Sequence, residues 1–166
     1  MVRVGSETSA RQHPVLAPGS TWQLQSDCDA YSRPRGCGLA TQVRRGRGLR
    51  LLQAPRGLEG GSRLRVRLLE DGYPCWFETT DLLSHARPAP PPTPRPWDRS
   101  GIETRLERVL SFAQTAMACA NTYLWGGTLG PDYDCSGLVQ SAFADQGIWL
   151  PRDAYLQERF CRPVAV

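Results

Sequence analysis

The segment Asp134-Cys135-Ser136-Gly137-Leu138-Val139 predicts the start of an amphipathic helix with a cysteine in its first turn. The glycine-rich stretch before it, Trp125-Gly-Gly-Thr-Leu-Gly-Pro131, predicts a loop that lets the backbone turn tightly. A thiol at a helix start faces the positive end of the helix dipole, which favours the thiolate. Backbone N–H groups there can also stabilise an oxyanion. The segment therefore predicts a cysteine nucleophile at Cys135, and a cysteine that only packs is the alternative.

Helical patterns surround this segment. Ser100 and Glu103 predict a capping box that starts a helix, and Asn121 predicts the end of the same helix. Its apolar face is expected to hold Ile102, Leu106, Val109, Leu110, Ala113 and Met117. The helix at Cys135 is expected to stop at Gly147, with a shorter helix over 153–160 after it. The inward side chains expected on the Cys135 helix are Leu138, Val139, Ala142 and Phe143.

Short strands are predicted in the first half of the chain. Leu64, Val66 and Leu68 alternate with arginines, which is the period of a half-buried strand. Further strands are expected at 21–24, 39–43, 48–52 and 75–78, with turns at 32–36, 55–57, 60–61 and 71–72. Several short strands joined by tight turns predict a small barrel.

A proline-rich segment separates the two patterns. Six prolines lie between positions 88 and 96, where they favour an extended and stiff chain. We interpret the segment as a semi-rigid linker, with a ligand for a proline-binding domain as the alternative. The predicted organisation is a tail at 1–19, a barrel at 20–84, the linker at 85–99 and a helical domain at 100–166.

Composition narrows the classes of function. The formal charge of the 166 residues is +4, much of it from Arg44, Arg45, Arg47 and Arg50. No nucleic-acid motif accompanies this cluster, so we expect solvated arginines and no nucleic-acid partner. No stretch predicts a membrane span or a signal peptide, so we expect a cytoplasmic protein without a membrane partner.

The six cysteines do not predict a metal or another cofactor. They show no CxxC pair and no downstream histidine, so a zinc site is not expected. In a reducing compartment we expect most of them to be free, buried thiols. A bridge between Cys28 and Cys37 is the alternative for an exported protein.

Several motifs resemble the NlpC/P60 family of papain-like cysteine peptidases. They are Tyr123-Leu-Trp-Gly-Gly127, Asp134 to Val139, Phe143, Gly147-Ile148 and Leu150-Pro-Arg152, within residues 101–160. Leu39-Ala-Thr-Gln42 and Glu70-Asp-Gly-Tyr-Pro-Cys-Trp76 resemble the bacterial SH3-like barrel of cyanobacterial members. The resemblance implies an α+β fold, with an SH3-like β-barrel before the helical N-terminal half of a papain-like domain. It also implies cleavage between D-glutamate and a diamino acid in cell-wall peptides.

The resemblance implies four site residues. Cys135 matches the nucleophile, and Asp134 and Ser136 match positions that hold the free amine of the substrate's N-terminal L-alanine. Tyr73 matches a barrel tyrosine that closes the same pocket. Two other interpretations stay open, because Asp134 is also a good N-cap and Tyr73 could belong to the barrel core.

The position of the histidines departs from the family pattern. In the family the catalytic histidine follows the cysteine, whereas His13 and His85 both precede Cys135. We interpret the sequence as an N-terminal part of a longer enzyme or a shortened gene product, inactive by itself. His85 is not expected to be the base, because a stiff linker separates it from the thiol.

Two alternatives to a peptidase remain. The barrel could be a non-catalytic module that binds cell-wall peptides. The cysteine could instead serve acyl transfer on lipids, although a lipid ester offers no ammonium group for Asp134 and Ser136.

Overall fold

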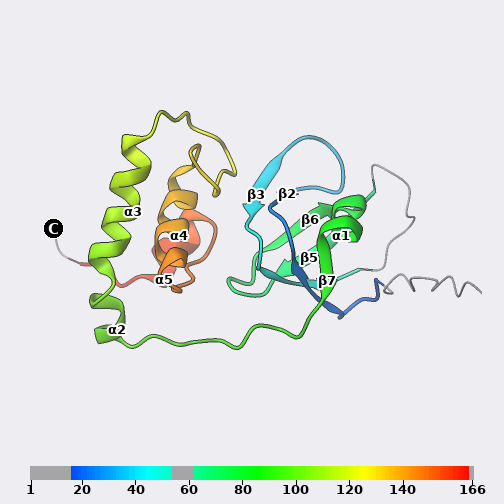
Figure 1. Ribbon diagram of the computed structural model, residues 1–166, viewed down its shortest axis with the longest axis horizontal. Helices are drawn as coiled ribbons and strands as arrows, with labels where there is room; N and C mark the ends of the chain where they lie inside the picture. Colours follow the sequence, from blue (N-terminus) through cyan, green and yellow to red (C-terminus); the bar gives the residue numbers. More distant parts are fainter. Residues whose placement is uncertain (1–15, 54–61, 165–166) are drawn as a thin grey trace, which may run out of the picture.

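The computed structural model describes residues 16–53 and 62–164. The predicted tail up to residue 15 and the predicted turns at 55–57 and 60–61 lie outside the described residues. Strands gather in one half of the molecule and helices α2 to α5 in the other, joined by an extended segment (Figure 1). The α+β fold expected from the sequence is confirmed.

The strand half is one antiparallel sheet in the order β3-β2-β6-β5-β4-β1-β7. Its strands are β1 (Thr21–Leu24), β2 (Cys28–Tyr31), β3 (Leu39–Val43), β4 (Gly48–Leu51), β5 (Arg63–Leu68), β6 (Pro74–Glu78) and β7 (Ala86–Pro88). This sheet and the helix α1 (Thr79–His85) are called the barrel below. The predicted strands are present, and β2, β7 and α1 are additions that the sequence did not reveal.

The alternation of apolar and polar residues along the strands produces the core of the barrel. Leu64, Val66 and Leu68 of β5 are buried, and Arg65 and Arg67 between them face solvent. Phe77 of β6 and Leu82 of α1 close the same core. Each such side chain stabilises the fold by about 1.5–3 kcal/mol relative to an exposed one.

The second half contains four helices. They are α2 (Arg99–Glu103), α3 (Leu106–Ala118), α4 (Cys135–Asp145) and α5 (Ala154–Phe160). The single helix predicted from Ser100 is wrong in two respects, because α2 and α3 are separate and Asp98 is the N-cap. The Asp98 carboxylate accepts from the Gly101 N–H at 2.7 Å, so the helix starts earlier and Ser100 lies inside it. Asn121 donates to the Cys119 carbonyl at 2.7 Å just beyond the end of α3.

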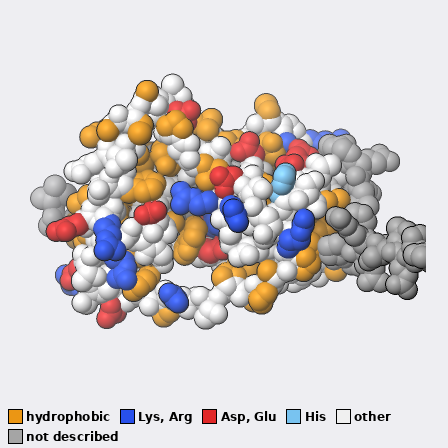
Figure 2. All heavy atoms as spheres, in the orientation of Figure 1, with side chains coloured by type: hydrophobic (Ala, Val, Ile, Leu, Met, Phe, Trp, Pro, Cys, Tyr) orange, Lys and Arg blue, Asp and Glu red, His pale blue; other side chains and the backbone are white. Residues whose placement is uncertain are grey.

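The faces of α3 and α4 differ from the expectation. Val109 is the buried residue of α3, whereas Leu110 is 62% exposed and Met117 is 78% exposed. Val139 of α4 is also exposed, although an inward side chain was predicted. Figure 2 shows hydrophobic side chains at the surface of this half. The buried side of α4 is instead small and polar, comprising Ser136, Gly137, Gln140, Ser141 and Ala142.

The linker contacts both halves. Its first residues form β7, which pairs with β1, so the sheet extends past the predicted barrel boundary. Pro92 lies against Gly48 of β4. Trp97 donates its indole N–H to the Gly147 carbonyl at 2.9 Å and stacks under Arg105. Among the described residues, no helix has the length and apolarity that crossing a bilayer requires.

Candidate active site

Cys135 is the first residue of α4 and is exposed. Its side chain faces a cleft of about 530 Å³ between α3, α4 and the 121–133 loop. The Tyr123 hydroxyl donates to the Cys135 sulfur at 4.0 Å. The local features predicted for a nucleophile, a helix start and an approachable sulfur, are therefore present together.

Glycines allow the close approach of loop and helix. A Cβ at Gly137 would overlap the carbonyl oxygen of Gly127, so the first turn of α4 touches loop backbone directly. Gly126 has φ +86°, a left-handed conformation, and its α-carbon packs against Leu39 of the barrel. These glycines let the barrel edge contact the loop, and the loop contact the start of α4, at backbone distance.

Asp134 is the N-cap of α4, and its carboxylate is fully engaged within the chain. One oxygen accepts from the Gly137 N–H at 2.6 Å, and the other accepts from the Gly126 N–H at 2.8 Å. Arg152 donates to the same two oxygens at 3.1 and 2.6 Å, a bidentate ion pair. The N-cap interpretation from the sequence is confirmed.

The protonation of Asp134 follows from these partners. Burial alone would raise the pKa of its carboxyl, but the hydrogen bonds from Arg152 and the Gly137 N–H outweigh burial. The pKa of Asp134 therefore lies below its ordinary value, and the side chain is a carboxylate at neutral pH.

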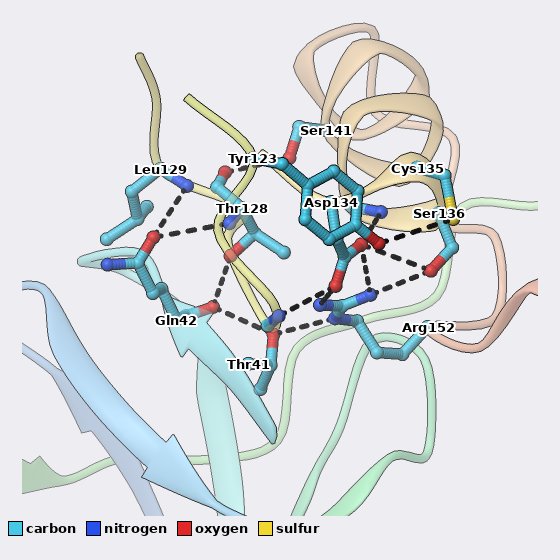
Figure 3. Close-up of polar contacts among 12 residues, drawn as sticks. Thr41, Gln42, Tyr123, Thr128, Leu129, Asp134, Cys135, Ser136, Ser141 and Arg152 are labelled. Carbon is cyan, nitrogen blue, oxygen red and sulfur yellow. Dashed lines mark hydrogen bonds and ion pairs between the residues drawn. The ribbon is translucent and has the colours of Figure 1, made fainter. Parts of the chain in front are cut away.

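Arg152 connects both neighbours of Cys135 to the barrel (Figure 3). Its side chain is 3% exposed. One Nη donates to the Ser136 hydroxyl at 2.9 Å, and Nε donates to the Thr41 hydroxyl of β3 at 3.0 Å. The Leu150-Pro-Arg152 motif drew attention to this arginine, but no local signal in the sequence showed that it is buried or which residues it contacts.

The edge strand β3 docks on the loop before Cys135 (Figure 3). The Gln42 N–H donates to the Gly126 carbonyl at 3.1 Å, and the Thr128 hydroxyl donates to the Gln42 carbonyl at 2.6 Å. The Gln42 side-chain oxygen accepts from the N–H groups of Thr128 and Leu129 at 3.3 Å each. The barrel thus holds the loop in the way that one strand holds another.

Tyr73 lies where the two halves meet. It packs against the barrel core, and Asp153, the residue after Arg152, lies close to its hydroxyl. Burial and the neighbouring Asp153 raise the pKa of Tyr73 to about 12. The next helix also contacts the nucleophile segment, since Gln157 of α5 donates to the Ser136 carbonyl at 3.0 Å.

The structure therefore brings three of the predicted site residues together and connects the fourth indirectly. Asp134, Cys135 and Ser136 are consecutive at the helix start, and Tyr73 reaches the same region through Asp153. Their substrate-binding roles stay predictions. The sequence analysis did not name Asp153, which follows Arg152 and lies near Tyr73.

The histidine of the described chain lies elsewhere. His85 ends α1, which packs on strands of the barrel, and His13 is outside the described residues. Within residues 16–53 and 62–164 no imidazole is hydrogen-bonded to Cys135, and no group of three potential metal ligands occurs.

Two families match the chain. Residues 30–82 match the bacterial dipeptidyl-peptidase SH3 domain, and residues 120–164 match the NlpC/P60 family. The fold and the matched segments define a two-part protein, an SH3 domain followed by a helical segment with a cysteine at a helix start. The segment that carries Cys135 therefore matches the model of the NlpC/P60 family, a family of cysteine peptidases.

Three solved structures are similar to this chain. An NlpC/P60 family protein from Bacillus cereus ATCC 10987 is 23% identical, with 89% of this chain and 42% of that chain covered and a TM-score of 0.32. NlpC2 from Trichomonas vaginalis is 12% identical, with 89% and 75% covered and a TM-score of 0.40. NlpC1 from the same organism is 20% identical, with 88% and 46% covered and a TM-score of 0.32. The chain thus spans less than half the length of the first and third of these proteins. No curated protein sequence gave a significant match.

Proposed function

We propose that this chain carries the nucleophile half of a cell-wall peptide hydrolase that cuts between γ-D-glutamate and a diamino acid. The observation that supports it best is Cys135, exposed at the start of α4 in a cleft beside the docked barrel. In this reaction the thiolate attacks the γ-carbonyl carbon, the C–N bond breaks, and the diamino acid leaves with a proton on its nitrogen. Water then hydrolyses the thioester.

The proton transfers need a general base within hydrogen-bond reach of the sulfur. The described partner of Cys135 is the Tyr123 phenol, which is too weak a base for this role at neutral pH. We therefore expect little or no cleavage unless a histidine base reaches the thiol, and the described residues do not place one beside Cys135.

Recognition of a free N-terminus requires a carboxylate that is open to an ammonium group. Asp134 already uses both oxygens on Arg152 and on backbone N–H groups. Asp153 is half-buried, caps no helix N–H with its side chain, and has the Tyr73 hydroxyl beside it. We propose that Tyr73 and Asp153 hold the ammonium, while Asp134 and Ser136 shape the site through Arg152.

The barrel contributes to this site and is not proposed as an independent peptide-binding module. Its edge strand β3 is occupied by the 126–129 loop, and Tyr73 points toward Asp153 of the other half. A barrel docked in this way limits the substrate to short peptides with a free amine. Cytoplasmic recycling of released wall peptides is the setting that this restriction suggests.

The test uses an affinity label that does not depend on turnover. L-Ala-γ-D-Glu, with a chloromethyl ketone in place of the scissile amide, is incubated with the full chain, and labelling of the Cys135 peptide is followed by mass spectrometry. The matched reagent is the same molecule acetylated on its amine. We expect the free amine to label Cys135 at least about ten-fold faster, the difference that one charged contact of about 1.4 kcal/mol provides. Equal rates would refute recognition of the N-terminus, and labelling that persists in Cys135→Ser would refute the nucleophile.

A further inference from the structure

We propose that Arg152 is a positioning residue that couples the docked barrel to the reactivity of Cys135. The inference rests on the proposed function only in taking Cys135 as the reactive group. Through Arg152, the side chain of Thr41 in the barrel controls how the start of α4 is held.

The first observation is that every nitrogen of a buried guanidinium is used. Burying a charge is costly unless it is paired and hydrogen-bonded, so its partners define its role. Nε donates to Thr41, one Nη donates to Ser136 and Asp134, and the other Nη donates to Asp134. A fork of this shape can meet a carboxylate and two hydroxyls at once, which a lysine cannot.

The second observation is that the partners of Arg152 at the start of α4 lie on both sides of the thiol in the sequence. Asp134 and Ser136 are the residues on either side of Cys135, so one guanidinium fixes the chain before and after it. Asp134 also holds the Gly126 N–H of the loop at 2.8 Å. A shift of Arg152 would therefore move the loop, the N-cap and the first turn together.

The third observation is that the Thr41 hydroxyl, the barrel partner of Arg152, both donates and accepts a hydrogen bond. Thr41 is 0% exposed, and its hydroxyl donates to the Gln42 carbonyl at 3.1 Å while it accepts from Arg152. The single proton of the hydroxyl is used in the barrel, so its lone pair is directed at Nε. The same strand holds the loop through Gln42, and Thr41 adds the link to the helix start.

The pair also has an electrostatic consequence. The Asp134 carboxylate directly precedes Cys135, and a negative charge there opposes formation of a thiolate. Arg152 neutralises that charge. The other titratable groups that line the cleft are Tyr123 and Tyr133, and α3 lines it with Leu110, Ala113, Gln114, Ala116 and Met117. Asp153, the N-cap of α5, lies near Tyr73 and does not line the cleft.

The experiment measures iodoacetamide alkylation of the full chain, resolved by peptide mass spectrometry between about pH 6 and 9. The readout is the Cys135 rate divided by the rate at Cys119, an exposed thiol that serves as an internal reference. The variants are Arg152→Gln, Arg152→Lys, Thr41→Val, Thr41→Ser and the double variant Arg152→Gln with Thr41→Val. Arg159→Gln, an exposed arginine of α5, is the matched control.

We expect Arg152→Gln to lower the ratio about ten-fold near neutral pH, with the loss shrinking as the pH rises. Arg152→Lys should recover part of the ratio, and Thr41→Val should lower it about three-fold, whereas Thr41→Ser and Arg159→Gln should leave it unchanged. In the double variant Thr41→Val should add no further loss, because its effect passes through Arg152.

An unchanged ratio in folded Arg152→Gln would overturn the proposal, as would a loss that is the same at every pH. If Arg152→Gln does not fold, Thr41→Val becomes the test of the coupling. An unchanged alkylation ratio in that variant would refute it. Because no peptide is involved, failure of the peptide affinity label with these results intact would count against the proposed function alone.

Discussion

Replacement of Asp134 tests how much of the fold depends on one carboxylate. Asp134→Ala removes the N-cap of α4, the acceptor for the Gly126 N–H and both bonds to Arg152. Loss of an N-cap costs about 1 kcal/mol. Breaking a buried ion pair by removing one partner costs about 3–5 kcal/mol, because the remaining charge is buried without compensation. Since the two effects share hydrogen bonds, we expect about 4 kcal/mol in total, a large fraction of the 5–15 kcal/mol typical of a domain.

The assay is urea unfolding followed by tryptophan fluorescence, with Trp125 and Trp149 as reporters in the helical half. For a slope of about 2 kcal/mol per molar urea, the loss lowers the unfolding midpoint by about 2 M. Asp134→Asn keeps an acceptor for the cap and should lose roughly half as much.

The double variant Asp134→Ala with Arg152→Met supplies the control. It removes both buried charges, so it should be more stable than Asp134→Ala alone by about 2 kcal/mol. A midpoint shift below about 0.5 M for Asp134→Ala, or strict additivity in the double variant, would show that the pair contributes little and that the reasoning is wrong.

Three further predictions follow from the same contacts. Because the folded pKa of Asp134 is depressed, its stabilisation is complete above the unfolded pKa of about 3.9 and is lost as the pH falls through the folded pKa. Urea midpoints measured below about pH 4 should therefore fall more steeply in the wild type than in Asp134→Asn. Gly126→Ala should destabilise the contact with Leu39 by about 2 kcal/mol or more, seen as faster proteolysis of the linker, and no change would contradict the strain at φ +86°. Tyr73→Phe should reduce the preference for the free-amine label over the acetylated one about three-fold, because Asp153 loses its hydroxyl partner, and an unchanged preference would place the amine elsewhere.

Alternation and turn residues made most of the sheet predictable. Four of the five predicted strands have apolar residues that repeat with period two and are buried in the structure, whereas β3 buries the consecutive residues Ala40 and Thr41. The strand β2 contains Asp29, a residue type that is depleted in strands, and β7 contains Pro88, which an edge strand tolerates. Pairing with β1 across the sheet, not local propensity, makes Ala86–Pro88 a strand.

The helical half was less predictable because its apolar residues do not mark its contacts. Leu110 and Met117 gave the periodic signal of α3, yet they are exposed. The side of α4 that meets the loop and the barrel is made of small and polar residues such as Gly137 and Gln140, which a hydrophobic pattern does not detect. Backbone contact through Gly137 and the Gln140–Asp71 hydrogen bond at 2.9 Å determine this packing.

Local sequence patterns also predicted only part of the candidate site. Cys135 and the cap at Asp134 were visible locally, because a helix start has a sequence signature. The partner of Asp134 lies 18 positions further along the chain, and the partner of Arg152 in the barrel lies 111 positions before it. Such pairs depend on tertiary structure and have no local signature.

The hydrogen-bond capacity of Asp134 constrains any account of substrate binding. Its two oxygens accept five hydrogen bonds, from Gly137, Gly126, the Ser136 hydroxyl and the two Nη atoms of Arg152, so the roughly four lone-pair sites of the carboxylate are all in use. A substrate ammonium at Asp134 would have to displace Arg152 and leave a guanidinium buried without its partner. An ammonium at Asp153 displaces nothing that is buried. Its binding at that position would therefore leave the network around Cys135 intact, so the residue that recognises the substrate and the residue that positions the nucleophile can be different carboxylates.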